Sequence, residues 1–204
     1  MKNKQEIFQP IFAQSWQDLP NVLRRHYGNR SFCNDITVFS GVMDVYYSKF
    51  FTLFLPFFKF FKTLIPHQGH NIAVTVKYLS DPNSDFFYIN RTFHFAKKDY
   101  VFNSKMLHLK NSEVAEFMRF GIGWKMDYLY ENSKIILRHK NYFIKIFNFL
   151  LPLTFLNFVL GKNYCEEIAL SDDEFFMKLQ MRHSWLGVLF EYKGKFKFIS
   201  YEQK

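Results

Sequence analysis

Alternation of apolar and polar side chains with a period of two is the feature that most constrains the fold of this chain. In FEYKGKFKF, residues 190–198, aromatic residues and one glycine alternate with lysines and a glutamate. The segments FFYINRTFHF (86–95), WKMDYLY (124–130) and EFFMKLQMR (174–182) repeat the alternation with other residues. A period of two is typical of β-strands that bury one face, and the chain contains about nine or ten such segments.

Short turn signals separate the predicted strands. They are SDPNSD, AKKD, GIG, ENS and SDDE. Connections this short leave no room for crossover helices, so neighbouring strands should be antiparallel. The sequence therefore predicts an α+β domain with a mainly antiparallel meander of about nine strands, curled into a barrel or half-barrel.

Two strongly apolar segments interrupt the meander, and each contains a Leu-Pro pair. Because proline lacks an N–H and clashes with the preceding turn, we expect helices near 44–64 and 142–160 that kink at these pairs. Lysines interrupt both segments, which argues against transmembrane spans. We expect the first segment to line the interior, with Lys59 and Lys62 reaching water. The chain is predicted to be a single domain, 1–204, with short helices in residues 1–30 and the curled sheet in 31–204.

The net charge of +9 favours anionic partners, such as a membrane surface rich in acidic lipid. Nucleic acid is not an expected partner, because the aromatic residues and the lysines occupy opposite strand faces.

Cys33 and Cys165 have no CxxC spacing and are expected to be buried reduced thiols. The N-terminus lacks the apolar run of an export signal, so we expect a cytoplasmic protein that contacts the inner membrane peripherally.

Arg91 breaks the alternation, because it shares a predicted strand face with Phe87 and Phe93. An isolated buried charge is very costly, so the guanidinium needs a partner. Glu116 lies on an apolar face of SEVAEFMRFG, and Glu166 lies on the face of NYCEEIAL that carries its isoleucine. We predict that Arg91 pairs with Glu116, with Glu166 as the alternative partner.

This pair has two interpretations. It is either a buried ion pair that fixes strand register, or a cavity site in which Arg91 holds a carboxylate or phosphate head group. The residues considered as ligand-binding candidates are Arg91, Glu116, Glu166, Arg119 and Tyr192.

Motifs for other chemistry are missing from the sequence. It has no GxGxxG for a dinucleotide and no GxSxG for a nucleophilic serine. His67 and His70 flank a loop without further metal ligands nearby, and a metal site normally needs three or four. We therefore expect no cofactor and no metal.

Several segments follow one another along nearly the whole chain: LPNVLRRHYG, NIAVTV, FFYINRTFHF, EFMRFG, CEEIAL and HSWLGVLFEYKGKF. In order and spacing they resemble the bacterial domain-of-unknown-function family 4166, although this chain is richer in phenylalanine and lysine. The resemblance implies that some relatives carry the domain behind an NAD(P)-binding dehydrogenase-like domain or a membrane segment. It implies no activity for this chain.

Three functional hypotheses remain open at this point. The first is a non-enzymatic carrier of a lipid or other hydrophobic molecule in a β-lined cavity. The second is an enzyme acting on such a molecule, with Glu116 and Glu166 as acid and base. The third is an interaction module that docks its apolar segments on a dehydrogenase or membrane partner. The sequence leaves the oligomeric state open.

Overall fold

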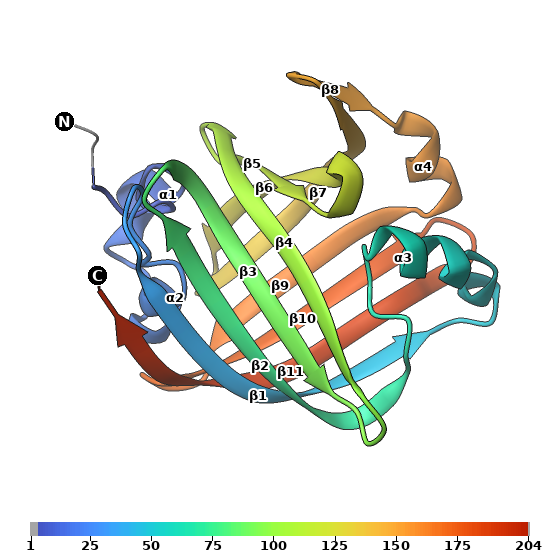
Figure 1. The fold of residues 1–204 in the computed structure, drawn as a ribbon, viewed down its shortest axis with the longest axis horizontal. Coiled ribbons are helices and arrows are strands. Elements are labelled where there is room, and N and C mark those ends of the chain that lie inside the picture. Colours follow the sequence, from blue (N-terminus) through green and yellow to red (C-terminus); the bar gives the residue numbers. More distant parts are fainter. Residues whose placement is uncertain (1–3, 204) are drawn as a thin grey trace.

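The structure, a computed structural model, describes residues 4–203. These residues form one antiparallel sheet of eleven strands, and ten of them close into a barrel because β6 pairs with β7 (Figure 1). The strands are β1 (Ile36–Tyr47), β2 (Gly69–Asp81), β3 (Ser84–His94), β4 (Asp99–Lys110), β5 (Glu113–Phe117), β6 (Ile122–Glu131), β7 (Lys134–Ile146), β8 (Phe149–Pro152), β9 (Lys162–Ala169), β10 (Glu174–His183) and β11 (Gly187–Glu202). The predicted antiparallel barrel is confirmed.

The barrel is an up-and-down meander in which sequence neighbours pair. β8 pairs with β7 but lies outside the ring. The pairs β7–β9 and β1–β11 join strands that are not neighbours in sequence, and they close the barrel. Tight turns connect the hairpins. Asn132 and Ser133, between β6 and β7, both have positive φ values, as two-residue hairpin turns with the twist of the strands require. Closure leaves the ten barrel strands without a free edge.

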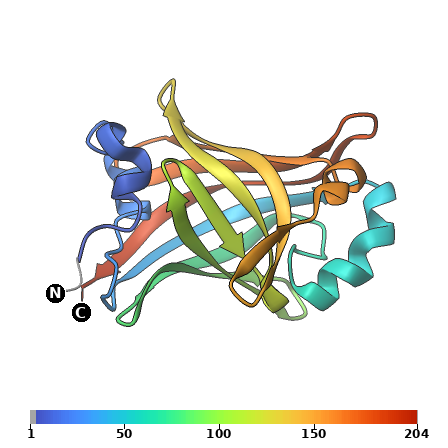
Figure 2. The ribbon, with the colours of Figure 1, turned by 90° about the horizontal axis from the view of Figure 1, so that it is seen from above.

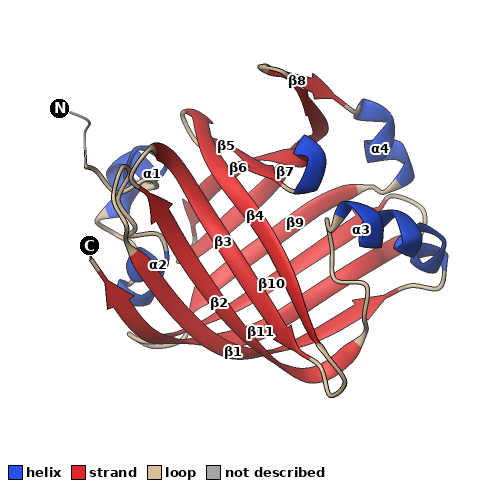
Figure 3. Ribbon diagram, in the orientation of Figure 1, coloured by secondary structure: helices blue, strands red, loops and turns tan. Residues whose placement is uncertain are grey.

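Helical segments cover the two ends of the barrel. At one end lie α1 (Gln9–Phe12), the 3₁₀ turn η1 (Ala13–Trp16) and α2 (Asn21–His26). At the other end lie η2 (Phe50–Phe54), α3 (Leu55–Phe61), η3 (Arg119–Gly121) and α4 (Thr154–Val159). Figures 1 and 2 show α1 and α2 opposite α3 and α4, and Figure 3 separates these helices from the strands by colour.

The predicted helices near 44–64 and 142–160 are shorter than expected. The first apolar segment does bend at its proline, where η2 passes into α3 and Pro56 occupies the first helical turn. The second segment is different, since residues 142–152 belong to β7 and β8. Pro152 ends β8, which lies outside the ring and tolerates a residue without an N–H. In this segment only α4 is helical.

The core follows the predicted alternation. Inward-facing residues such as Phe87, Ile89 and Phe93 of β3 are 3% exposed or less. The N-terminal helices insert aromatic side chains into their end of the barrel, and the Phe8 ring lies 5.0 Å from that of Phe87. Pro20 holds the N-cap position of α2. These helices thus close one end with rings that join the barrel core, and we call them the plug.

The two cysteines are free and buried, as predicted. Cys165 is fully enclosed, and burial raises the pKa of its thiol well above the ordinary value. Since thiolate is the reactive form, both thiols should react with a disulfide reagent at least about a hundredfold more slowly in the native protein than in urea. Absorbance after addition of dithionitrobenzoate measures this rate. Rapid reaction of either thiol in the native protein would contradict the packing described.

Candidate functional site: a polar cavity inside the barrel

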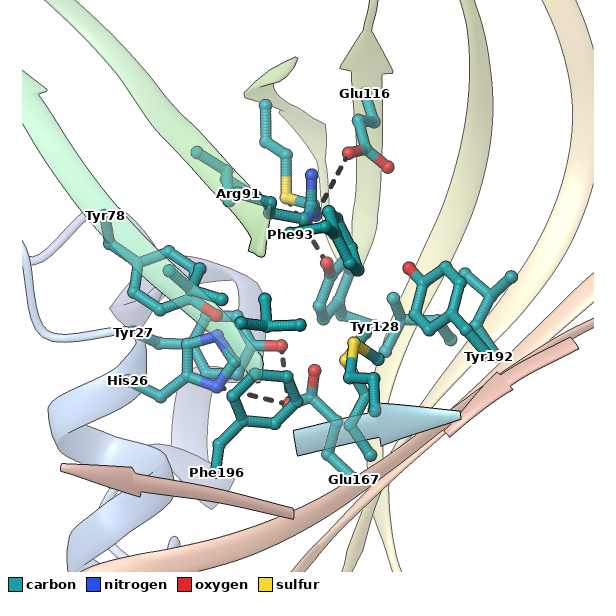
Figure 4. A pocket seen from close by; sticks show the side chains of 18 of the residues that line it. His26, Tyr27, Tyr78, Arg91, Phe93, Glu116, Tyr128, Glu167, Tyr192 and Phe196 are labelled. Carbon is teal, nitrogen blue, oxygen red and sulfur yellow. Dashed lines mark hydrogen bonds and ion pairs between the residues drawn. The ribbon is translucent and has the colours of Figure 1, made fainter. Parts of the chain in front are cut away.

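A small cavity lies inside the barrel, between the plug and the helices at the opposite end. Its volume, measured as the space open to the centres of water molecules, is about 30 Å³. That is room for roughly two or three waters. Its polar lining consists of His26, Tyr27, Tyr78, Arg91, Glu116, Trp124, Tyr128, Glu167 and Tyr192. Figure 4 labels all of these except Trp124. Methionine, leucine, valine, isoleucine and phenylalanine side chains form the remainder.

The predicted pair of Arg91 and Glu116 is confirmed. Arg91 Nη2 lies 3.4 Å from Glu116 Oε1, and their side chains are 12% and 6% exposed. Ser104 Oγ donates to the same carboxylate oxygen at 2.6 Å, and Trp124 Nε1 donates to Oε2 at 2.7 Å. These four residues come from β3, β4, β5 and β6, which are consecutive in the sheet. Period-two alternation on each strand therefore builds the cluster.

Arg91 has hydrogen-bonding capacity left over. Its Nη1 donates to Ser104 Oγ at 2.9 Å and its Nη2 to Glu116. Among the described residues these are its two hydrogen bonds, so three of the five guanidinium N–H groups have no protein acceptor. Burial is the largest single effect and lowers the pKa of Arg91, but the Glu116 carboxylate and the smaller effects of Tyr192, Tyr78 and Tyr128 together raise it above its ordinary value. The guanidinium is thus a fixed positive charge with free donors.

A second polar cluster joins the plug to β9. Tyr27 OH donates to Glu167 Oε2 at 2.8 Å, and His26 Nδ1 lies 3.5 Å from the same oxygen. All three side chains are buried. Because α2 places His26 and Tyr27 side by side at the barrel interior, the plug supplies part of the cavity wall (Figure 4).

This second cluster is uncharged below neutral pH. Burial raises the pKa of Glu167 to about 7, against the smaller opposing effects of the Tyr27 hydrogen bond and Arg91. Burial, followed by the charge of Arg91, lowers the pKa of His26 to about 3. The contact between His26 and Glu167 is therefore not an ion pair. His26 Nδ1 has no hydrogen-bond partner within residues 4–203 in the arrangement described, and a protonated Glu167 would supply the missing donor.

Tyrosine hydroxyls complete the polar lining. Tyr128 OH donates to Met106 Sδ at 3.3 Å, which is a weak acceptor. The hydroxyls of Tyr78 and Tyr192 make no hydrogen bond to any described residue, and both side chains line the cavity. Burial raises the pKa of each well above the ordinary value, so both remain neutral hydroxyls that can donate.

The sequence candidates do not all reach this cavity. Arg91, Glu116 and Tyr192 do, whereas Glu166 faces the outside of β9 and lies 3.4 Å from Lys134 Nζ. Arg119 is exposed on η3, where it donates to the carbonyl oxygen of Phe60. Glu116 and Glu166 therefore lie on opposite sides of the barrel wall and cannot flank one substrate as acid and base. The inward carboxylate of β9 is Glu167.

An apolar chamber adjoins the polar cavity. Its volume on the same measure is about 50 Å³. It is lined by Phe57, Phe58, Thr63, Leu64, Met118, Ile122, Gly123, Trp124, Tyr142, Leu156, Leu160, Asn163 and Met181. Trp124 lines both spaces, so its indole forms part of the wall between them.

Hydrogen bonds hold α4 over this chamber. His139 on β7 lies 2.8 Å from Asn157 Oδ1, and His183 Nε2 lies 2.8 Å from the carbonyl oxygen of Phe158. On the other side, Phe51 and Phe58 stack at 4.7 Å and anchor η2 and α3. The two helical segments thus close this end of the barrel with side chains rather than with strands.

Residues 4–203 contain no group of three or more histidine, cysteine, aspartate or glutamate side chains placed to hold a metal ion. No helix within that range is both long enough and apolar enough to cross a bilayer.

A family model described as a domain of unknown function (DUF4166) matches residues 19–196. The match covers all eleven strands except the last residues of β11. No curated protein is similar to the chain at a significant level.

Proposed function

The chain belongs to the DUF4166 family, whose description names no activity, so we propose a function from the interior site: the barrel binds a small, mainly apolar molecule that carries a hydrogen-bond-accepting head group. A carboxylate fits best. The observation that carries the proposal is the surplus of donors in an enclosed cavity, namely Arg91 and the hydroxyls of Tyr78 and Tyr192. Buried donors are normally paired, so free ones lining a cavity are suited to a ligand or to water.

The charge balance of the cavity supports a carboxylate head group. Arg91 is the positive charge, and Glu116 is already held by three donors. Glu167 is mostly neutral below its pKa of about 7, so it adds little repulsion there. A carboxylate that reached the free N–H groups of Arg91 would gain charge-assisted hydrogen bonds, which are stronger than neutral ones.

The positions of the two adjoining spaces predict how the ligand would be oriented in the barrel. The head group would lie near Arg91, and the apolar part would extend past Trp124 into the chamber between α3 and α4. The described spaces are too small for a drug-sized molecule, which needs about 300 Å³ or more. Binding therefore requires displacement of water and repacking of flexible lining residues, for which Met43, Met106 and Met177 are suited.

Binding of cis-parinaric acid, a fluorescent fatty acid, tests the proposal. We expect micromolar or tighter binding by the wild-type protein and weaker binding of the methyl ester, which lacks the negative charge. Tyr192→Phe removes a hydroxyl without a protein partner and should weaken binding of the acid about fivefold to tenfold. Fluorescence titration measures each affinity.

Tyr46→Phe is the matched control, because Tyr46 is 51% exposed on the barrel exterior and should leave binding unchanged. Native mass spectrometry and organic extraction of the purified protein provide a second measurement. Failure of the wild type to bind the acid, together with no extracted apolar molecule, would refute the proposal. Equal affinity for acid and ester would refute the assignment of the head group to Arg91.

A further inference from the structure

Because successive strands run in opposite directions, the connections between them lie alternately at the two ends of the barrel. The connections at the plug end are residues 4–35, the short turns after β2, β4 and β6 and the loop 170–173. The opposite end, which we call the lid end, consists of residues 48–68, 95–98, 118–121, 147–161 and 184–186. Figure 2 shows the lid end on the right, with α3 and α4 projecting from it.

Exposed apolar side chains are concentrated at the lid end. Of the nineteen large apolar residues that are exposed within residues 4–203, twelve lie there, and the connections at the plug end hold one, Leu170. The twelve are Phe50, Leu53, Phe57, Phe60, Phe120, Phe147, Phe149, Leu151, Phe155, Phe158, Trp185 and Leu186. Single exposed apolar residues are ordinary, but a concentration of this size marks an interaction surface.

The charged residues in the lid-end connections are all positive. Its connections contain six cations, Lys49, Lys59, Lys62, Lys97, Lys98 and Arg119, and no aspartate or glutamate. None of the six forms an ion pair with a carboxylate among the residues described. The connections at the plug end are mixed, with Lys4, Arg24, Arg25 and Arg30 against Glu6, Asp18, Asp35, Asp172 and Asp173. The net charge is thus +6 at one end and −1 at the other.

We propose that the lid end docks on the surface of a lipid bilayer that contains anionic lipids. Aromatic and leucine side chains would enter the interfacial region, while the surrounding lysines contact phosphate groups. Long lysine side chains can extend from an apolar surface to a charged one, so both groups can bind at once. The lack of carboxylates in these connections matches a negatively charged partner, and the nearby carboxylate of Asp99, at the start of β4, lies 3.1 Å from His94 Nδ1.

The composition and shape of the lid end favour a bilayer over a protein partner. Lysine is depleted from protein–protein interfaces, whereas here five lysines lie in the connections at the same end as the exposed apolar residues. The most exposed rings stand at hairpin tips on separate elements: Phe147, between β7 and β8, is 88% exposed, and Trp185, between β10 and β11, is 77% exposed. Separate projecting rings can enter a fluid surface without needing a shape-matched pocket.

Flotation with vesicles tests the apolar contribution. The wild-type protein should bind phosphatidylcholine vesicles that contain phosphatidylglycerol much more tightly than vesicles of phosphatidylcholine alone. Phe147→Ser/Trp185→Ser should reduce binding to the mixed vesicles at least about tenfold, since each ring buries a large apolar area. Val42→Ser/Ile199→Ser is the matched control, because both residues are exposed outside the lid end and should leave binding unchanged.

A second pair of variants tests the electrostatic contribution to vesicle binding. Lys59→Gln/Lys62→Gln should weaken binding to the mixed vesicles roughly fivefold per lysine, about 25-fold together. Lys195→Gln/Lys197→Gln removes the same charge from exposed positions on β11 and should have a much smaller effect. Added salt should weaken wild-type binding. Circular dichroism and unfolding midpoints should be unchanged in all four double variants, because the altered side chains are exposed.

Several results would overturn the proposal. One is the absence of wild-type binding to mixed vesicles at low salt, and another is binding that the lid-end variants leave intact. If light scattering finds a dimer without lipid and the Phe147/Trp185 variant is a monomer, then a second copy of the chain covers this face instead. The proposal is independent of the cavity ligand, since the weaker parinarate binding expected of Tyr192→Phe should leave vesicle binding unaffected.

Discussion

Arg91→Ala should lower the free energy of unfolding by about 3–5 kcal/mol, because it leaves the buried Glu116 carboxylate without its counter-charge. Glu116 is 6% exposed on its side chain and lies 3.4 Å from Arg91. Ser104 and Trp124 would still donate to it, but neutral donors compensate a buried charge only in part. Urea denaturation followed by circular dichroism measures the loss.

Two further variants separate the lost charge pair from the lost side-chain volume. Arg91→Met/Glu116→Gln removes both charges, and the glutamine oxygen can still accept from Trp124 while its amide N–H donates to Ser104 Oγ, so this protein should recover at least half of the loss. Arg138→Ala breaks a 2.6 Å pair with Glu131 in which both side chains are largely exposed, and it should cost no more than about 1 kcal/mol. An Arg91→Ala loss as small as that of Arg138→Ala would mean that the interior pair is solvated.

The strand pattern could be predicted from the sequence because alternation depends on local chemistry. On β3 the phenylalanines fix which face is buried, so Arg91 had to point inward, and the same reasoning placed Glu116 and Tyr192. The meander of short hairpins implied a barrel or half-barrel, whereas the pairs that close the ring, β7 with β9 and β1 with β11, join strands far apart in the sequence and no local pattern encodes them.

The inward carboxylate of β9 could not be identified in the same way. In NYCEEIAL the two glutamates are adjacent, so one faces inward and the other outward. The bulkier apolar residue, Ile168, lies with Glu166 and suggests that this face is buried. The register decides otherwise: Cys165 is opposite Leu179 and Glu167 is opposite Met177, so Glu167 shares the interior face. The prediction of Glu166 as the inward carboxylate was wrong because the bulky apolar Ile168 lies on the outer face.

The contribution of the plug to the site depends on tertiary packing alone. His26 follows two arginines at the end of a short helix, which in sequence indicates a solvated histidine at a helix terminus. In the structure its ring lies 4.4 Å from that of Tyr78 on β2 and 4.8 Å from that of Phe175 on β10, two strands that β1 and β11 separate in the sheet. No local pattern in residues 19–28 encodes that the barrel end is open to receive it.

Glu167→Gln should become more stable relative to wild type as the pH rises from about 4.5 to about 7, by a total of about 3 kcal/mol. Burial raises the pKa of Glu167 to about 7 in the folded protein, from an ordinary value of 4.5. In this pH range the folded wild type binds a proton that the unfolded chain has released. Its stability contribution is therefore fully present below pH 4.5 and is lost as the pH rises through 7, whereas glutamine does not titrate.

The titration of His26 changes stability with pH in the opposite direction, so it must be separated from the effect of Glu167. Its folded pKa of about 3 lies below the ordinary 6.5, so its contribution is present above pH 6.5 and is lost as the pH falls toward 3. Because His26 is present in both proteins, its effect cancels in the difference between Glu167→Gln and wild type. Urea unfolding at several pH values measures that difference, and Glu166→Gln on the outer face is the matched control, with a small effect on stability. A difference for Glu167→Gln that stays constant from pH 4.5 to 7 would mean that its carboxylate is ionised throughout, and the second cluster would then carry a charge into the ligand cavity.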